Sequence, residues 1–161
     1  MWWRIGHAYQ AKGAAKNKSA FKRIVRQGPP PGLLAFEGEV PVGWCQLTPR
    51  SALEHLEGSR ILARVDDVAV WSLSCFFVKR SHRGKGVMRA LIVGAVRAAK
   101  RAGAPALEAY PWAAHGPRPV RAKYTGIATT FLRAGFREIA RRKDDRPILR
   151  YEFARKRKAA A

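Results

Sequence analysis

The most constraining feature of this 161-residue sequence is a strand-like run followed at once by a glycine-rich turn and an amphipathic helix. Residues 69–78 are β-branched and aromatic with little polarity, which predicts a central strand covered on both faces. The helix expected to begin near Val87 carries its apolar residues on one stripe, and Gly103 ends it. A second strand-like run, 106–110, follows. A right-handed strand–helix–strand crossover makes these two strands parallel.

The other predicted elements are shorter. An amphipathic helix is expected from about Ser19 to Gly28, another helix around 125–134, and a helical turn or two within 50–61. Residues 1–16 show no clear period. Four further strand-like runs are expected at 33–36, 42–47, 136–141 and 148–153.

Length and composition indicate one folded unit. The chain is 47% hydrophobic and 27% charged, which predicts a single domain over 1–153 and a disordered basic tail over 154–161. We expect a cytoplasmic protein without membrane contact, because no apolar run could span a bilayer and no secretory signal begins the chain. Cys45 and Cys75 lie in apolar runs, which favours buried free thiols over a disulfide or a metal site.

The charge of the chain is extreme. It has 32 Lys and Arg against 11 Asp and Glu, a formal net charge of +21. Such a protein attracts polyanions, including nucleic acid, acidic proteins and phosphorylated cofactors. Between Val68 and Arg137 the only acidic residue is Glu108, while many basic residues crowd the glycine-rich turn and the helix after it. We therefore expect the anion site there.

Glycines stand at positions 84 and 86, directly before the helix. Unpaired N–H groups at a helix start, with glycines that admit a close approach, form a cradle for phosphate. The alternative is a tight turn with basic residues on a solvated rim. The turn lacks the spacing of a P-loop, and Arg89 breaks the dinucleotide-binding pattern.

These residues resemble a known family. The segment Val78-x-x-x-x-Arg83-Gly84-Lys85-Gly86-Val87 is similar to the acyl-CoA pyrophosphate loop of the GNAT acetyltransferase superfamily, and Phe131-Leu132-Arg133-Ala134-Gly135-Phe136 is similar to its segment ending in Gly-Phe. The resemblance covers about 33–153. It implies a mixed α/β fold with a largely antiparallel twisted sheet, flanking helices and a central parallel strand pair splayed at the acyl-CoA site. Three shorter segments, 43–45, 71–76 and 124–126, resemble a bacterial subgroup of this superfamily, and this resemblance does not identify a substrate.

The resemblance also implies a function. An N-acetyltransferase of this family transfers acetyl from acetyl-CoA to a primary amine of an acceptor, which is a small molecule or a macromolecule. The end of the central strand would pair with the pantetheine arm, and the turn would hold the diphosphate, with charge added by Arg83 and Lys85. The residues expected at acyl-CoA are Phe76, Phe77, Val78, Arg83, Gly84, Lys85, Gly86, Val87, Met88 and Phe131.

The chain departs from the family pattern at the positions that move protons. Phe131 stands where a Tyr general acid is frequent, Tyr124 where Asn is frequent, and Ser81 where Gln or Arg opens the loop. The expected central strand carries no carboxylate. Catalysis would then run mainly by proximity, with a water chain as base and Tyr124, Cys75 or Ser74 near the leaving thiolate.

Three residues have two interpretations each. Glu108 lies on the strand expected to line the cleft and is the best candidate for a general base; the alternative is a carboxylate paired with Arg. His82 could touch phosphate or be an exposed loop residue. Trp112 could border the acceptor site or simply pack.

Two function classes stay open. The first is the acetyltransferase, for which the net charge favours an anionic acceptor or one carried on an acidic or nucleic-acid partner. The second is a protein that binds acyl-CoA or nucleic acid without turnover, as Phe131 would suggest. The sequence does not decide between monomer and homodimer. A first strand normally precedes the first helix in this family, so we expect a truncated or late-starting chain.

Overall fold

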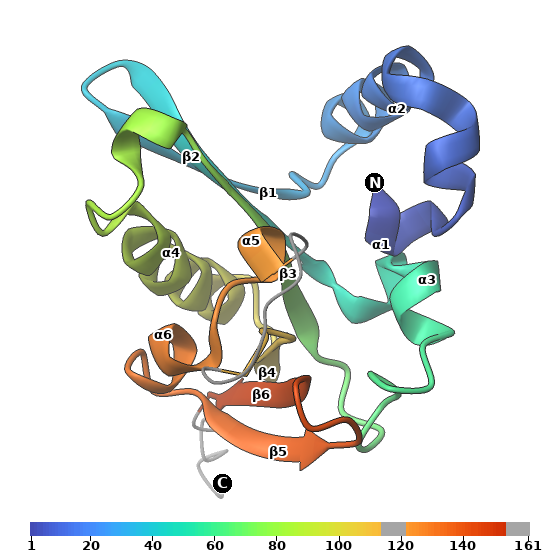
Figure 1. The fold of residues 1–161 in the computed structure, drawn as a ribbon, viewed down its shortest axis with the longest axis vertical. Helices are drawn as coiled ribbons and strands as arrows, with labels where there is room; N and C mark the ends of the chain where they lie inside the picture. Colours follow the sequence, from blue (N-terminus) through green and yellow to red (C-terminus); the bar gives the residue numbers. More distant parts are fainter. Residues whose placement is uncertain (114–121, 154–161) are drawn as a thin grey trace, which may run out of the picture.

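The computed structural model describes residues 1–113 and 122–153, and the basic tail expected at 154–161 lies outside them. A six-stranded sheet runs through the molecule in the order β1-β2-β3-β4-β6-β5 (Figure 1). The β3–β4 pair is parallel and every other neighbouring pair is antiparallel, which confirms the expected mixed sheet. The strands are β1 (Gly32–Glu37), β2 (Val40–Pro49), β3 (Trp71–Val78), β4 (Ala106–Ala109), β5 (Arg137–Arg141) and β6 (Pro147–Glu152).

The helices differ from expectation at the start of the chain. The helix expected from Ser19 begins at Ala8, with a break at Gly13, whose φ is 70°. The break and the scarcity of apolar residues before Phe21 explain why its first half shows no period. The helix expected at 125–134 is two short ones. The helical segments are α1 (Trp2–Ile5), α2 (Ala8–Gln27), η1 (Arg50–Ala52), α3 (Glu54–Glu57), η2 (Arg80–His82), α4 (Val87–Arg101), α5 (Ala122–Thr125) and α6 (Ala128–Leu132).

Different elements cover the two faces of the sheet. Helix α4 buries Leu91, Ile92, Ala95 and Ala99 in the larger core cluster, which confirms the expected stripe. A second cluster lies on the other face, where α1, η1 and α3 cover the sheet; it consists of Leu53, Leu56, Leu62, Tyr110 and Ile148, with Trp3 packed against it. The parallel pair is thus enclosed by two apolar layers over its first residues.

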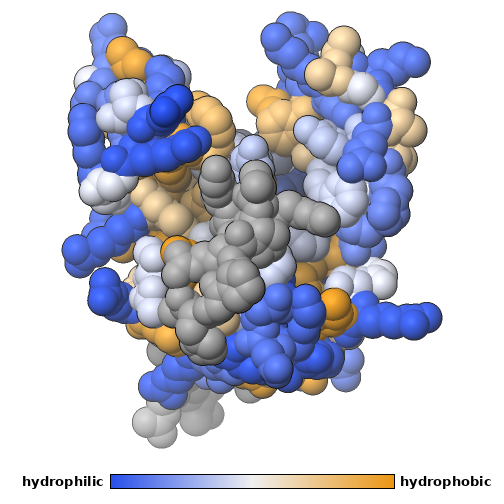
Figure 2. Space-filling view, viewed as in Figure 1, coloured by the Kyte–Doolittle hydropathy of each residue, from blue (hydrophilic) through white to orange (hydrophobic). Residues whose placement is uncertain are grey.

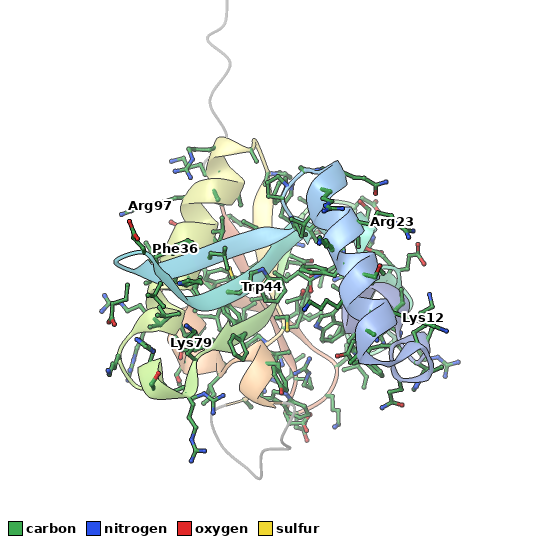
Figure 3. The ribbon with its side chains drawn as sticks, turned by 90° about the horizontal axis from the view of Figure 1, so that it is seen from above. Lys12, Arg23, Phe36, Trp44, Lys79 and Arg97 are labelled. Atoms are coloured by element: carbon green, nitrogen blue, oxygen red, sulfur yellow. The ribbon has the colours of Figure 1, made fainter. Side chains whose placement is uncertain are left out.

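The end of β3 is less covered than the sequence predicts. Phe77 is 51% exposed, on the face away from α4, in register with Trp44 of β2. Figure 2 shows a hollow between the β1–β2 hairpin and the N-terminal helices, with hydrophobic side chains on both walls. Helix α2 lies beside the hairpin (Figure 3), where the rings of Phe21 and Trp44 meet edge to face with centroids 5.8 Å apart. The face of β3 opposite α4 is therefore no longer covered at the end of the strand.

Both cysteines are free thiols, as expected, Cys45 fully buried and Cys75 half-buried. Within residues 1–113 and 122–153, no helix is long and apolar enough to cross a bilayer. No group of three His, Cys, Asp or Glu side chains in those ranges is placed to hold a metal ion.

Candidate active site

The central parallel strands stay together for three residues and then part. β3 pairs with β4 only from Trp71 to Leu73, whereas its pairing with β2 continues to Val78. The register of β2 against β3 shifts between Gln46 and Leu47, which leaves Ser74 as an extra residue in β3 where the strands part. Among the described residues, the main chain of β3 beyond Leu73 has no strand partner on the β4 side. The carbonyls of Ser74 and Val78 accept hydrogen bonds from the side chains of Trp3 and Arg83. The other N–H and C=O groups that point to the β4 side are free to pair with an extended ligand.

The turn after β3 exposes its backbone. Gly84 and Gly86 have φ values of 78° and 81°, a conformation that side-chain-bearing residues rarely adopt. A methyl group on either glycine would meet no heavy atom within 4 Å, so the turn is open on that side. In the part of the chain that the structure describes, the N–H groups from Gly84 to Arg89 donate to no backbone carbonyl, and the first helical bond runs from Ala90 N to Gly86 O. This arrangement at the start of a 15-residue helix suits an anion.

The basic residues of the turn are not equivalent. Arg83 folds back and donates from Nε to the carbonyl of Val78 at 3.3 Å, while Lys85 is exposed. His82 is half-buried, with Nε2 3.0 Å from a carboxylate oxygen of Glu37 and Nδ1 2.9 Å from Ser81 Oγ. The hydrogen bond to His82 lowers the pKa of Glu37. His82 therefore has protein partners on both ring nitrogens.

Phe131 connects α6 to the end of the central strand. It is fully buried, with its ring centroid 5.8 Å from that of Phe76 and 5.5 Å from that of Phe136. The neighbouring Gly126 packs against the side chain of Met88 at the start of α4. The expected apolar residues thus come together beside the turn, and none of them offers a proton.

Two candidate proton carriers lie near the parted strands. Tyr124 is 52% exposed on α5, which packs beside β3. Cys75 is half-buried on β3, and burial raises the pKa of its thiol, which keeps the proton on sulfur at neutral pH. Ser74 is engaged elsewhere: its hydroxyl donates to Gln46 Oε1 at 3.1 Å, and its carbonyl accepts from Trp3 Nε1 at 3.0 Å. The role of Trp3 had no signal in the sequence.

Glu108 is held by cations. It is 2% exposed, and its carboxylate lies 2.7 Å from Arg150 Nη2 and 3.3 Å from Arg50 Nη1. The hydroxyl of Tyr110 donates to the same carboxylate at 2.9 Å and lies 2.9 Å from Ser72 Oγ. The structure therefore favours the second interpretation of Glu108, a carboxylate paired with arginine, because both its oxygens already accept hydrogen bonds.

This cluster extends to the surface. Arg150 also pairs with Asp66 at 2.6 Å, and its hydrogen bonds lower the pKa of Asp66. Arg50 is 1% exposed and bonds Glu57 at 3.0 Å, and Glu57 in turn bonds Arg64. The ion pairs join β4 and β6 to η1, α3 and the segment after α3, which lie over the face opposite α4, so their role is to fix that face.

A groove of about 630 Å³ lies on the outer flank of α4. Its walls belong to β1, β2 and the region of α4, and they include Phe36, Val93 and Arg97. Figure 3 shows Phe36 on the hairpin and Arg97 on α4. Lys85, Gly86 and Val87 also line this groove, so it reaches the open turn. No residue of β3 or β4 lines it, so it does not extend into the gap between the parallel strands.

Comparison with known protein families identifies the class of protein to which this fold and open turn belong. The profile of the acetyltransferase (GNAT) family matches residues 2–115, more than half of the chain. The protein belongs to this family. A search of curated proteins gave no match.

Solved structures share the fold at low identity. The ribosomal-protein-alanine N-acetyltransferase of Brucella melitensis is 18% identical over 88% of this chain and 80% of its own, with a TM-score of 0.57. The protein yncA of Salmonella typhimurium, solved with its cofactor acetyl-CoA, is 18% identical over 92% and 79%, also with a TM-score of 0.57. The PaiA N-acetyltransferase of Thermoplasma acidophilum, in complex with coenzyme A, is 13% identical over 86% and 72%, with a TM-score of 0.53.

Proposed function

We propose that this protein is a cytoplasmic N-acetyltransferase that transfers acetyl from acetyl-CoA to a primary amine. The observation that carries the proposal is the stretch of β3 beyond Leu73 that has no strand partner on the β4 side and leads to the open turn at Gly84 and Gly86. An extended arm ending in a diphosphate needs both features side by side. Membership of the acetyltransferase family supports the same reading. The catalytic unit we propose is a single domain over 1–153.

The residues present fit acyl-CoA. Phe76, Phe77 and Val78 form the strand end that would pair with the amides of the arm. The N–H groups from Gly84 to Met88 would hold the diphosphate, with charge from Lys85, whereas the N–H of Arg83 already donates to the carbonyl of Arg80 at 3.4 Å. The buried ring of Phe131 supports Phe76 from α6 and so fixes the strand end. Bound acetyl-CoA supplies the activated thioester, and the protein contributes placement and exclusion of water.

Proton transfer falls to the residues around the gap. The acceptor nitrogen must lose a proton on bonding to the acyl carbon, and the departing sulfur must gain one. Tyr124 has a phenol that can donate a hydrogen bond, and burial keeps the proton on the Cys75 thiol. Both residues lie on elements beside the gap, so we assign the acid role to one of them. Glu108 we assign to positioning, since it holds Arg50 and Arg150.

Calorimetric titration with acetyl-CoA, followed by a thiol-release assay over a panel of amines, tests the proposal. We expect binding and turnover, and Tyr124→Phe or Cys75→Ser should lower turnover without weakening acetyl-CoA binding. If both variants turn over acetyl-CoA as fast as the unchanged protein, neither residue takes part in the mechanism.

A second function is favoured by Phe131, which cannot donate a proton, and by the net charge of +21. It is binding of acyl-CoA or nucleic acid without turnover. Repeating the assays with and without RNA separates the two functions. If RNA binds tightly and acetyl-CoA gives no heat of binding, the result supports the second function and contradicts the enzyme proposal.

A further inference from the structure

One buried cation lacks a carboxylate partner. Arg146, just before β6, is 8% exposed, and its only described side-chain hydrogen bond is from Nη1 to Thr125 Oγ1, at 3.3 Å. Its guanidinium carbon lies 4.5 Å from the ring centroid of Trp112. Arg50 and Arg150, the other buried arginines of the described residues, each bond carboxylates. Burial lowers the pKa of Arg146 to about 10, opposed in part by the charge of Asp145.

The rest of the sequence adds no acidic side chain that could pair with Arg146. The residues outside the described ranges, 114–121 and 154–161, contain neither Asp nor Glu. The adjacent Asp145 is paired with Lys143 at 3.1 Å through one oxygen, and its other oxygen is buried without a hydrogen-bond partner. Within the described residues this guanidinium is held only by a hydroxyl and an aromatic face, and a buried cation held in this way is costly to keep. Such a cost is typical of a site that a ligand completes.

A second unsatisfied donor belongs to Trp112, the residue on whose ring this guanidinium stacks. Trp112 Nε1 is buried and has no hydrogen-bond partner among the described residues. Thr125 is buried too, and its hydroxyl, which accepts from Arg146, still has its own proton to donate. Three donors of this kind, one of them cationic, match the oxygens of a carboxylate or a phosphate.

The three residues lie where the parallel strands have parted. Trp112 follows β4 and pairs through its backbone with Gly126 and Ala128, at 3.0 and 2.8 Å. Thr125 ends α5, which packs beside β3. The turn that carries Arg146 is tied to the same place by a bond from Ala113 N to Asp145 O. The three residues are therefore neighbours beside the gap that would hold the thioester.

We propose that Arg146, Trp112 Nε1 and Thr125 Oγ1 form the acceptor-side pocket, and that they bind an oxyanion group carried by the amine substrate. This inference rests on the proposed function and narrows it to amines that bear a carboxylate or a phosphate. The pocket fixes the anionic end, which leaves the amine to reach the acyl carbon. The positive surface raises the local concentration of such substrates.

The first experiment compares amines in matched pairs under saturating acetyl-CoA. 4-Aminobutyrate and butylamine differ by a carboxylate, and O-phosphoethanolamine and ethanolamine differ by a phosphate. We expect kcat/KM to favour the anionic member of at least one pair by about tenfold or more. Arg146→Gln should abolish that preference by raising KM, while Arg137→Gln, an equal loss of charge on exposed β5, should keep it. If both variants keep the same preference for the oxyanion-bearing amine, the assignment of Arg146 to an acceptor pocket is wrong.

The second experiment does not depend on turnover or on acetyl-CoA. The indole N–H resonance of Trp112, assigned by its loss in Trp112→Phe, is followed while each of the four amines is added. We expect a saturable shift with an amine that bears the carboxylate or phosphate and none with its partner that lacks this group. No shift with either anionic amine would overturn the inference. If acetyl-CoA fails to bind while the indole still responds, the proposed function falls and the anion pocket stands.

Discussion

The strongest test of the open turn is a pair of glycine substitutions at the two ends of α4. Gly86 precedes the helix with a φ of 81°, and Gly103 follows it with a φ of 75°. A methyl group at either position would meet no heavy atom within 4 Å, so neither substitution creates a clash. Each change to Ala should cost about 1–2 kcal/mol of unfolding free energy, because both force a side chain into the left-handed region.

Only Gly86→Ala should also weaken coenzyme A binding. Its methyl group enters the space where the diphosphate would lie, and a lost hydrogen bond to a charged group is worth about 1.5–3 kcal/mol. The dissociation constant should therefore rise about 10- to 100-fold, whereas Gly103→Ala should bind like the unchanged protein. Calorimetric titration gives the affinities, and guanidinium unfolding gives the stabilities. Equal affinities in two variants of equal stability would refute the placement of the diphosphate.

Three further predictions concern the core and the ion pairs. Glu108→Gln should cost about 3 kcal/mol of unfolding free energy, since it leaves Arg50 and Arg150 buried with one fewer carboxylate; a loss of turnover without loss of stability would instead restore Glu108 as a base. Asp66 has a lowered pKa, so its contribution is present above its unfolded pKa of about 3.9 and lost as pH falls through the lower folded value. Asp66→Asn should remove that acid sensitivity. Its cost in unfolding free energy at pH 7 should be at most about 1 kcal/mol, because the Asp66 side chain is 40% exposed. Unfolding curves of both proteins, measured at pH 7 and below the unfolded pKa of Asp, would show the difference. Phe131→Ala should destabilise the fold by about 3–5 kcal/mol, measured by urea unfolding, and a cost under about 1 kcal/mol would contradict its place in the core.

The centre of the fold could be predicted because its signals are local. The apolar run at 69–78, the glycines before Val87 and the stripe along the next helix are each set by neighbouring residues. A parallel pair follows from that order because crossovers have one hand. Those signals also marked the turn at Gly84 and Gly86, which the structure leaves open.

The contacts that shape the other face could not be predicted, because they join residues far apart in the chain. Trp3 donates to the Ser74 carbonyl across 71 positions, and Arg50 reaches Glu108 across 58. Neither pair leaves a period or a spacing in the sequence. Arg146 shows the same limit, since its burial against Trp112 depends on how the last hairpin packs.

A crystal structure of the protein with coenzyme A tests the central claim most directly. The account expects the diphosphate on the amides of Gly84 to Met88 and the arm extended along β3 beyond Leu73. A coenzyme A whose arm lies against β1 instead of β3, or that is absent from that turn at saturating concentration, would contradict it.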